Sequence, residues 1–228
     1  IPKVNFYKKW FCKFAVWTIE MNLIIDIGNT STKLAVFQRD KVLIAKTVEG
    51  FSLVIEVENL LKQFNEIKRG FVSSVGFLSE DELKTLEKRL PMTVLNSTLK
   101  LPFKVHYKTP NSLGADRLAL MAAAATQYSG KNVLVIDAGS CITYDFIDSK
   151  KNYLGGAIAP GIQMRYKSLG DFTSSLPTLQ KIVPKNSIGN STHDSIHSGV
   201  INGVLYEIEG TVNEYQNKYP DLTVILTG

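Results

Sequence analysis

The chain has 228 residues, of which 44% are hydrophobic and 21% are charged, proportions typical of a globular protein with one large domain or two small ones. The net charge is +5, but no run of Lys and Arg and no basic stripe interleaved with aromatic residues indicates a nucleic-acid partner. No apolar run is long enough to span a membrane. The spacing of Cys12 and Cys141 fits neither a metal site nor a disulfide framework, which favours a reducing, cytoplasmic location.

The first 20 residues are interpreted apart from the rest of the chain. Residues 10–19 are apolar and aromatic and follow Lys8 and Lys9, as in a signal peptide, but Lys13 interrupts them and no small-residue cleavage site follows. Met21 is therefore interpreted as the natural start of the protein. We therefore treat residues 1–20 as an N-terminal extension, either upstream sequence or a non-native addition.

Residues 21–113 are predicted to form the first half of the molecule. Apolar runs and helical periodicity predict, in chain order, strands at 23–27, 32–38 and 41–48, a helix at 52–65, a strand at 70–75, a helix at 79–90 and a strand at 92–95. Ser52 and a capping box of Ser79 and Glu82 mark the starts of the two helices. Residues 96–113 contain two prolines and little periodicity, so we expect a loop that reaches a functional site.

Residues 114–228 are predicted to repeat this order. We expect a helix at 115–128, strands at 132–137, 141–147 and 153–158, a glycine-rich turn at 155–161, a helix after it, a loop at 175–190, a helix at 192–218 with glycines that mark close packing, and a strand at 222–226. Three antiparallel strands followed by helices and further strands predict an α/β protein in which helices cover two mixed sheets.

One short motif occurs once in each half. Asp26-Ile27-Gly28-Asn29 and Asp137-Ala138-Gly139-Ser140 each place an aspartate at the end of an apolar strand, before a glycine turn and another strand. Such a turn presents backbone N–H groups to an anion and a carboxylate to a cation, which suits Mg-ATP. A single turn of this kind is usually only a turn. Two in matching context predict related halves that face each other across a nucleotide.

Five motifs together resemble those of type III pantothenate kinases, in the superfamily of acetate and sugar kinases, chaperones and actin. They match in order and spacing over Met21–Gly228, and they are Asp26–Thr30, Gly114–Arg117, Asp137–Ser140, Gly155–Gly161 and Gly189–Thr192. The resemblance implies two tandem ribonuclease H-like, actin-like ATPase halves. It also implies phosphorylation of pantothenate by ATP to 4′-phosphopantothenate, the first step of coenzyme A synthesis. The family continues past a Thr-Gly-Gly turn, so an end at Thr227-Gly228 implies a C-terminal truncation.

The resemblance assigns ATP to the two turns. It implies contacts from Ser140, where the family usually has threonine, and from the first turn and its flanks, namely Asp26, Ile27, Gly28, Asn29, Thr30, Ser31, Thr32 and Lys33. Lys33 fits an exposed strand position equally well. Mg²⁺ would accompany ATP, and the resemblance implies that Asp137 binds a monovalent cation, K⁺ or NH₄⁺.

The resemblance also makes Asp116 the general base that accepts the proton of the pantothenate hydroxyl. An aspartate in a first helical turn can instead simply complement the helix dipole. Arg117 opposes that dipole, which favours a ligand role for this segment. Gly114, Ala115 and Arg117 would hold the anionic substrate together with the helix N-terminus.

Two further positions match substrate contacts of the family, Tyr107 and Thr192. Tyr107 fits a packing role as well, and either Thr192 or Ser191 fits a helix cap. The three histidines share no metal spacing, and we interpret His193 and His197 as surface residues.

The resemblance implies a homodimer whose interface closes the pantothenate pocket. The helix at 192–218 supports it with a broad apolar face, namely Val200, Ile201, Val204, Leu205 and Ile208, although packing against the protein's own sheet explains this face too. Two other functions stay open. The first is that of a kinase for another small hydroxyl or carboxylate substrate. The second is that of a non-catalytic regulatory member of the same fold.

Overall fold

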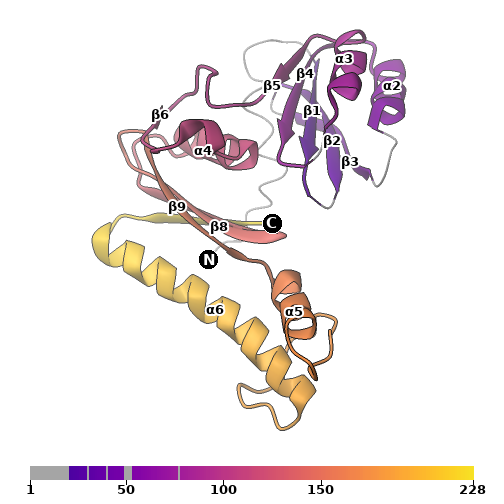
Figure 1. Cartoon of the computed structure of the whole chain (residues 1–228). Coiled ribbons are helices and arrows are strands. Elements are labelled where there is room, and N and C mark those ends of the chain that lie inside the picture. The colour runs from indigo at the N-terminus through magenta and orange to yellow at the C-terminus, as the bar shows by residue number, and fades with distance from the viewer. Residues whose placement is uncertain (1–20, 30, 40, 49–52, 77) are drawn as a thin grey trace.

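The computed structural model describes residues 21–29, 31–39, 41–48, 53–76 and 78–228. In these ranges the chain forms two five-stranded sheets, each with parallel and antiparallel strand pairs and each packed against helices (Figure 1). The N-terminal extension, Thr30 of the first turn and the predicted cap Ser52 lie outside the described residues.

The first sheet has the strand order β3-β2-β1-β4-β5. Its elements are β1 (Met21–Ile27), β2 (Thr32–Gln38), β3 (Lys41–Val48), α2 (Leu53–Gln63), β4 (Ile67–Ser74), α3 (Glu80–Glu87) and β5 (Met92–Val94). The central strand β1 is antiparallel to β2 and parallel to β4. The predicted capping box of Ser79 and Glu82 opens α3. The structure confirms the predicted order of strands and helices.

The second sheet repeats this topology with the order β10-β7-β8-β9-β6. Its elements are β6 (Lys104–Val105), α4 (Ala115–Gln127), β7 (Val133–Ala138), β8 (Cys141–Ile147), β9 (Asn152–Pro160), α5 (Ile162–Asp171), α6 (Thr192–Lys218) and β10 (Thr223–Thr227). The run β9-β8-β7-β10 corresponds to β3-β2-β1-β4, with β7 antiparallel to β8 and parallel to β10. The predicted fold class, two related α/β halves, is confirmed.

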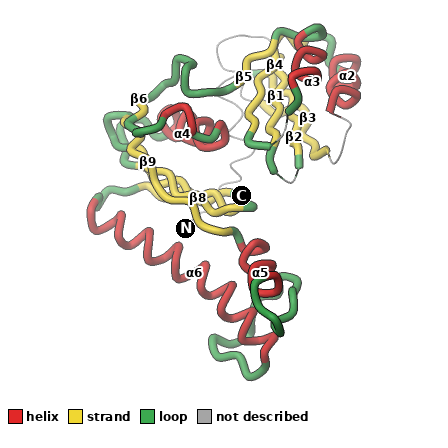
Figure 2. Tube along the Cα trace, viewed as in Figure 1, coloured by secondary structure: helices red, strands yellow, loops and turns green. Residues whose placement is uncertain are grey.

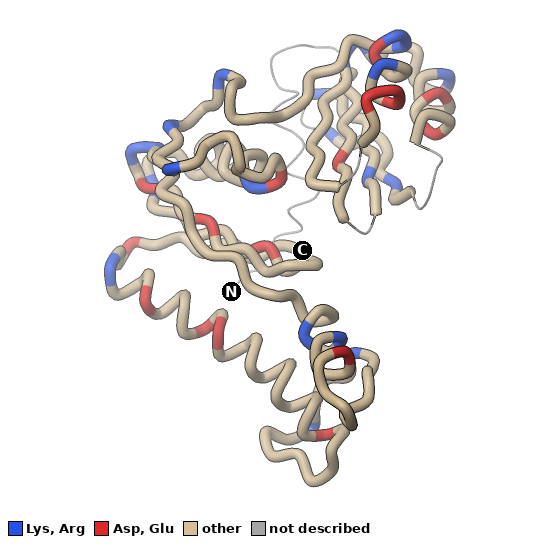
Figure 3. The backbone as a smooth tube through the Cα atoms, in the orientation of Figure 1, with Lys and Arg blue, Asp and Glu red and all other residues tan. Residues whose placement is uncertain are grey.

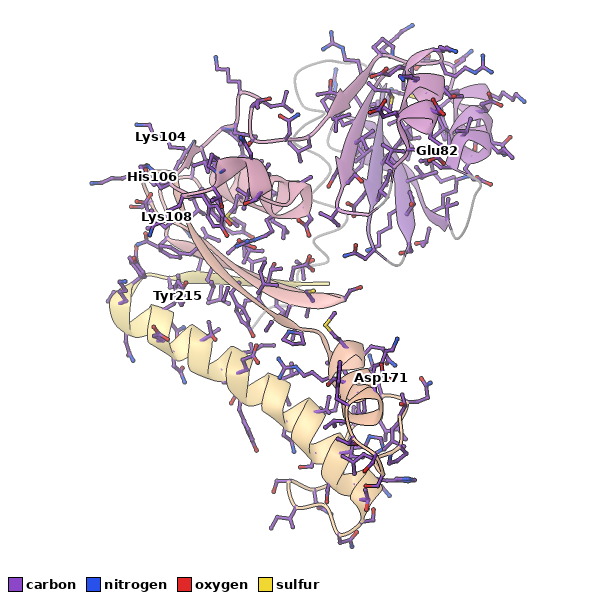
Figure 4. All side chains as sticks on the ribbon, in the orientation of Figure 1. Glu82, Lys104, His106, Lys108, Asp171 and Tyr215 are labelled. Atoms are coloured by element: carbon purple, nitrogen blue, oxygen red, sulfur yellow. The ribbon has the colours of Figure 1, made fainter. Side chains whose placement is uncertain are left out.

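Two local predictions were wrong. Residues 104–105, expected in a loop, form β6, which pairs in parallel with β9 because Lys104 aligns with Asn152 and Val105 with Tyr153. Lys104, His106 and Lys108 therefore lie along the outer edge of the second sheet (Figure 4). Residues 155–160 continue β9 and do not form a turn. The division of the chain at residue 114 stays a prediction.

Helix α4 lies between the two sheets. Its sequence is apolar on all sides, and the residues at 115 and 117–125 are buried, as expected of a helix that is covered all round. One hydrophobic cluster joins α4 to Ile24 and Phe37 of the first sheet and to Val133 and Val135 of the second. The first turn of α4 is thereby fixed at the junction of the two halves.

Helix α6 covers the other face of the second sheet. Val204, Ile208 and Val212 pack against β7 and β8, and the ring of Tyr215 lies 5.3 Å from that of Phe146, between helix and sheet (Figure 4). The helix continues past the sheet to α5 (Figure 1). A Cβ added at any of its three glycines, 199, 203 and 210, would meet no neighbouring element within 4 Å, so the predicted close packing does not occur among the described residues.

A loop of residues 172–191 connects α5 to α6 (Figure 2). It exposes several apolar side chains, namely Phe172, Ile182, Val183 and Ile188. Lys and Arg positions are interspersed with Asp and Glu on α2 and α3 (Figure 3). Among the described residues, no helix has the length and apolar character needed to cross a membrane.

Candidate active site

The first Asp-x-Gly turn joins β1 to β2. The Gly28 amide donates a hydrogen bond to the Ser31 carbonyl oxygen at 3.0 Å, which closes the turn. Gly76, which follows β4, packs behind it. A Cβ at Gly76 would lie 2.4 Å from the Gly28 carbonyl oxygen, so only glycine permits this approach. Asn29 is exposed beside the turn.

Asp26 lies at the end of β1, between Lys33 of β2 and Ser73 of β4. Burial raises the pKa of the Asp26 carboxyl above its usual value, and the Lys33 ammonium and the Ser73 hydroxyl oppose that rise. The negative charge of Asp116 on α4 raises the pKa further. The predicted ATP residues Asp26 and Lys33 therefore lie near the predicted base, which comes from the other half.

The second turn joins β7 to β8 and exposes Gly139 and Ser140. The Gly139 amide donates to the Cys141 carbonyl oxygen at 2.9 Å, and the Gly161 amide donates to that of Ser140 at 3.1 Å. A Cβ at Gly161 would lie 2.3 Å from the Ser140 oxygen, and one at Gly228, after β10, would lie 2.5 Å from the Ala138 carbonyl carbon. The second turn is therefore braced by glycines as the first one is.

Asp137, the last residue but one of β7, lies directly opposite Thr143 of β8. Burial raises the pKa of Asp137 to about 6, the charge of Asp116 adds to this, and Lys33 opposes it. Asp26 and Asp145 raise the pKa further. Carboxylates from both halves thus repel one another across the junction, and a cation or a phosphate-bound metal would relieve that repulsion.

Asp116 lies in the first turn of α4. Gly114, the N-cap, has no side chain to cap the helix, and Asp116 Oδ1 instead accepts a 2.7 Å hydrogen bond from the Arg117 amide. A Cβ at Gly114 would lie 2.5 Å from that oxygen, so glycine makes room for the carboxylate. Burial raises the pKa of Asp116, the Arg117 amide opposes the rise, and Asp145 reinforces it. Ala115 is buried beside this pair.

Arg117, which the resemblance assigns to substrate binding, is a buried cation. Only 5% of it is exposed, and its Nη2 lies 2.7 Å from Oδ1 of Asp145 on β8. Burial lowers the pKa of Arg117, but the bond to Asp145 outweighs it and keeps the guanidinium charged. Sequence reasoning missed Asp145, although an aspartate inside the apolar run of residues 142–147 is a signal of a buried partner.

Tyr107 lies beside Arg117. The Arg117 guanidinium carbon lies 5.8 Å from the centroid of the Tyr107 ring, and that ring stacks on Tyr153 at 6.2 Å and 10°. Gly155 has a φ of 97°, and a Cβ there would lie 3.3 Å from Tyr107 Cε2. The packing role and the binding role that the sequence left open are therefore compatible.

Thr192 does not join the cluster of Asp26, Asp116 and Asp137. It begins α6, whose first turn lies at the end of the molecule away from α4 (Figure 1). There Thr192 lines a groove of about 950 Å³ together with Arg165 of α5 and other residues of α5 and α6. The helix cap is Ser191, whose hydroxyl accepts a hydrogen bond from the Asp194 amide at 3.1 Å.

The surface interpretation was wrong for His197. It is buried, and its Nδ1 lies 2.8 Å from the Tyr166 hydroxyl, which ties α6 to α5. His193 is exposed. In the described ranges no three His, Cys, Asp or Glu side chains come close enough to hold a metal ion unaided.

Comparison with known proteins agrees with this arrangement. Residues 22–214 match the family model described as type III pantothenate kinase. A type III pantothenate kinase of Christiangramia forsetii is 47% identical over 208 residues, which cover 91% of this chain and 86% of the relative. One from Flavobacterium johnsoniae is 43% identical over 208 residues, with 91% and 85% covered.

The fold also has a counterpart among solved structures. A Campylobacter jejuni protein described as a Baf family transcriptional activator aligns with a TM-score of 0.50 over 82% of this chain and 78% of its own, at 24% identity. A likeness at this identity concerns the fold alone. The family model and the relatives instead match nearly the whole described chain, including both glycine turns and the first turn of α4, and on that ground the chain belongs to the type III pantothenate kinase family.

Proposed function

We propose that the protein transfers a phosphoryl group from ATP to the hydroxyl of pantothenate, with Asp116 as the general base. The product is 4′-phosphopantothenate, and the reaction is the first step of coenzyme A synthesis. One observation carries this proposal. The charge of Asp116 raises the pKa of Asp26 from the first half and of Asp137 from the second, and Asp26 also raises that of Asp137, at the junction between the two glycine turns. The relatives named above carry the same activity in their names.

Asp116 suits the role of base for two reasons. Its Oδ1 is fixed by the Arg117 amide, so the carboxylate has a defined orientation at the end of α4. Burial and the nearby charge of Asp145 raise its pKa, which makes the carboxylate a stronger proton acceptor than an exposed aspartate. Proton transfer from a bound hydroxyl to this group generates the nucleophile that attacks the γ-phosphorus, whose bond to the β,γ-bridging oxygen breaks as ADP leaves.

The two turns provide the phosphate contacts in this proposal. Gly28 and Gly139 allow close backbone approach, and Asn29, Ser31 and Ser140 add polar groups at the turn surfaces. The first turn and its flanks would also contact ATP through its remaining members, namely Asp26, Ile27, Thr30, Thr32 and Lys33. Most of the barrier is lowered by holding ATP and the hydroxyl in line.

The donor set fits hard cations. Carboxylate oxygens predominate at the junction, the Thr143 hydroxyl opposite Asp137 is buried without a hydrogen-bond partner in the described chain, and the repulsion among the aspartates favours a positive charge. Mg²⁺ usually binds through one or two carboxylates plus phosphates and water, which agrees with the absence of a three-residue cluster among the described residues. Asp26 would hold Mg²⁺ with ATP, and Asp137 would hold K⁺ or NH₄⁺. When bound, these ions neutralise phosphate charge.

A homodimer would complete the substrate site. Thr192 lies away from Asp116 within one chain, so its proposed contact with pantothenate requires a second copy of the protein. Helix α6 has room for such a copy, because a Cβ at Gly199, which lines the same groove as Thr192, or at Gly203 would have no neighbour within 4 Å. Leu205 and Tyr206 on the same helix are 50% and 63% exposed. We place this dimer in the cytoplasm, as the cysteine usage favours.

The proposal is tested by the substitution Asp116→Asn, which keeps the size of the side chain and removes the base. Turnover should fall by roughly 10²-fold or more, while circular dichroism stays unchanged. ATP consumption is measured with pantothenate and with other small hydroxyl and carboxylate compounds. Near-normal turnover of the variant would remove Asp116 from the chemistry, and absence of any turnover in the wild-type protein would favour the non-catalytic alternative.

A further inference from the structure

A buried polar cluster lies beneath the proposed substrate site, where α4 packs on β8 and β9. It consists of Arg117, Asp145, Tyr153 and Tyr107. Asp145 and Tyr153 are fully buried at 0% exposure, and Arg117 is 5% exposed. A buried charge of this kind is costly unless a partner holds it in good geometry.

Three donors converge on one oxygen of Asp145. Its Oδ1 accepts hydrogen bonds from Arg117 Nε at 2.8 Å and from the Tyr153 hydroxyl at 2.7 Å. Arg117 Nη2 lies 2.7 Å from the same oxygen but makes no aligned hydrogen bond. Within the described chain, Nη2 of Arg117 and Oδ2 of Asp145 have no hydrogen-bond partner.

Asp145 contacts only one edge of the planar guanidinium group of Arg117. A guanidinium has a side edge, formed by Nε and Nη2, and an end edge, formed by Nη1 and Nη2, and each edge matches a carboxylate. Asp145 occupies the side edge of Arg117, while Tyr107 covers one face of the guanidinium at 5.8 Å. The end edge includes the buried Nη2, which has no hydrogen-bond partner in the described chain, and a second carboxylate would supply that partner.

We propose that Asp145, itself held by Tyr153, is a positioning residue that orients Arg117 so that its end edge binds the carboxylate of pantothenate. The inference rests on the proposed function, because pantothenate supplies the anion. The Arg117–Asp145 pair is neutral as a whole, so it attracts an anion through the direction of its N–H groups more than through net charge. A long arginine side chain has many rotamers, and fixing it beforehand removes that entropy cost from substrate binding.

The first test compares two conservative variants with a matched control. Asp145→Asn keeps the shape but weakens the hold on the guanidinium, and we expect the KM for pantothenate to rise about 10-fold, as for loss of a hydrogen bond to a charged group. Tyr153→Phe keeps the ring and its stacking and should raise this KM about 3-fold. In Tyr153→Phe, kcat and the KM for ATP should stay within about 2-fold of wild type. Asp145→Asn also removes a charge that raises the pKa of Asp116, so kcat should fall in that variant as well.

The control is Tyr144→Phe. Tyr144 adjoins Asp145 on β8 but points to the opposite face, and its hydroxyl donates to Glu207 at 2.8 Å. The variant loses a comparable tyrosine–carboxylate hydrogen bond away from Arg117. Its pantothenate KM should equal that of the wild type. An equal KM increase in Tyr144→Phe and Tyr153→Phe would mean a general loss of stability and would overturn the assignment.

The second test is a double-mutant cycle with Arg117→Ala. If Asp145 acts only through Arg117, Asp145→Asn adds nothing to the pantothenate KM of Arg117→Ala. The same second substitution should raise the melting temperature, because Arg117→Ala alone leaves a buried unpaired carboxylate. A merely structural residue would not leave the pantothenate KM of Arg117→Ala unchanged while raising the melting temperature of that variant.

The outcomes separate this inference from the proposed function. If the wild-type protein does not turn over pantothenate, the proposed function fails. If it does and Arg117→Ala leaves the pantothenate KM unchanged, Arg117 does not bind the substrate, and this inference fails while the proposed function stands. If Arg117→Ala raises that KM while Asp145→Asn and Tyr153→Phe leave it unchanged, the positioning role fails alone. If Asp145→Asn does not fold, Tyr153→Phe against Tyr144→Phe decides the question.

Discussion

Replacing Asp137 with asparagine should stabilise the ligand-free protein while impairing the enzyme. The pKa of Asp137 rises from 3.8 to about 6 because burial and Asp116 disfavour its charged form more than Lys33 favours it. Each pKa unit corresponds to about 1.4 kcal/mol, so the ionised carboxylate costs the fold roughly 3 kcal/mol at pH 7.5. Asp137 is partly accessible to solvent, and we therefore expect Asp137→Asn to raise the free energy of unfolding by roughly 2 kcal/mol.

The pH dependence of this gain has a definite sign. The folded protein binds more protons than the unfolded chain between pH 3.8 and about 6, so this group lowers stability as the pH rises through that window. Below it the carboxyl is neutral in both states and asparagine offers no advantage. The difference in stability between Asp137→Asn and the wild type should therefore be largest above pH 7 and should nearly vanish toward pH 4.

Urea unfolding followed by circular dichroism measures this effect, without nucleotide or divalent cations, at pH 7.5 and 4.5. The matched control is Asp148→Asn. Asp148 Oδ1 accepts amide hydrogen bonds from Lys150 at 2.9 Å and Asn152 at 2.8 Å. Burial raises the pKa of Asp148, but Asn152 and Lys150 together outweigh burial and lower it. That variant should be destabilised at pH 7.5. An Asp137→Asn protein no more stable than the wild type at pH 7.5, or equally stabilised at both pH values, would refute the reasoning.

Three further predictions concern cations, the second turn and assembly. Activity with Mg²⁺ should be weak in sodium-only buffer and restored by K⁺ or NH₄⁺, and equal rates in Na⁺ and K⁺ would take the monovalent-cation role from Asp137. Gly161→Ala should raise the KM for ATP several-fold in steady-state assays, because its Cβ would lie 2.3 Å from the Ser140 carbonyl oxygen, and an unchanged KM would place ATP elsewhere. Dilution should lower activity and stability together, as sedimentation at micromolar concentration can follow, whereas a fully active monomer would contradict the dimer.

Strong local signals predicted most of the fold from the sequence. The bounds of α6 at 192 and 218 agree with the prediction, because a long helix with a clear cap differs sharply from the loops beside it. Both Asp-x-Gly turns lie between antiparallel strands as expected. The sequence did not predict β6, since two residues have no measurable periodicity and pair with β9 only through tertiary contact.

The site was predicted less completely than the fold. Asp116 and Tyr107 were identified through motif resemblance, and the structure brings both to Arg117. Asp145 was missed because its partner lies 28 residues earlier on another element, and no local pattern pairs them. His197 was misassigned for the same physical reason, since its burial depends on Tyr166 of α5 and not on its own helix.

The glycines behind the two turns make both halves of the repeated topology sensitive to mutation. Gly76 follows β4 and Gly228 follows β10, the strand that occupies the equivalent place in the second sheet, and each leaves no space for a side chain behind its turn. Both halves therefore have a position that does not tolerate substitution. Because the proposed nucleotide contacts both turns at once, an intact glycine in one half does not compensate for its loss in the other. The repeated topology thus adds a second sensitive position and no redundancy.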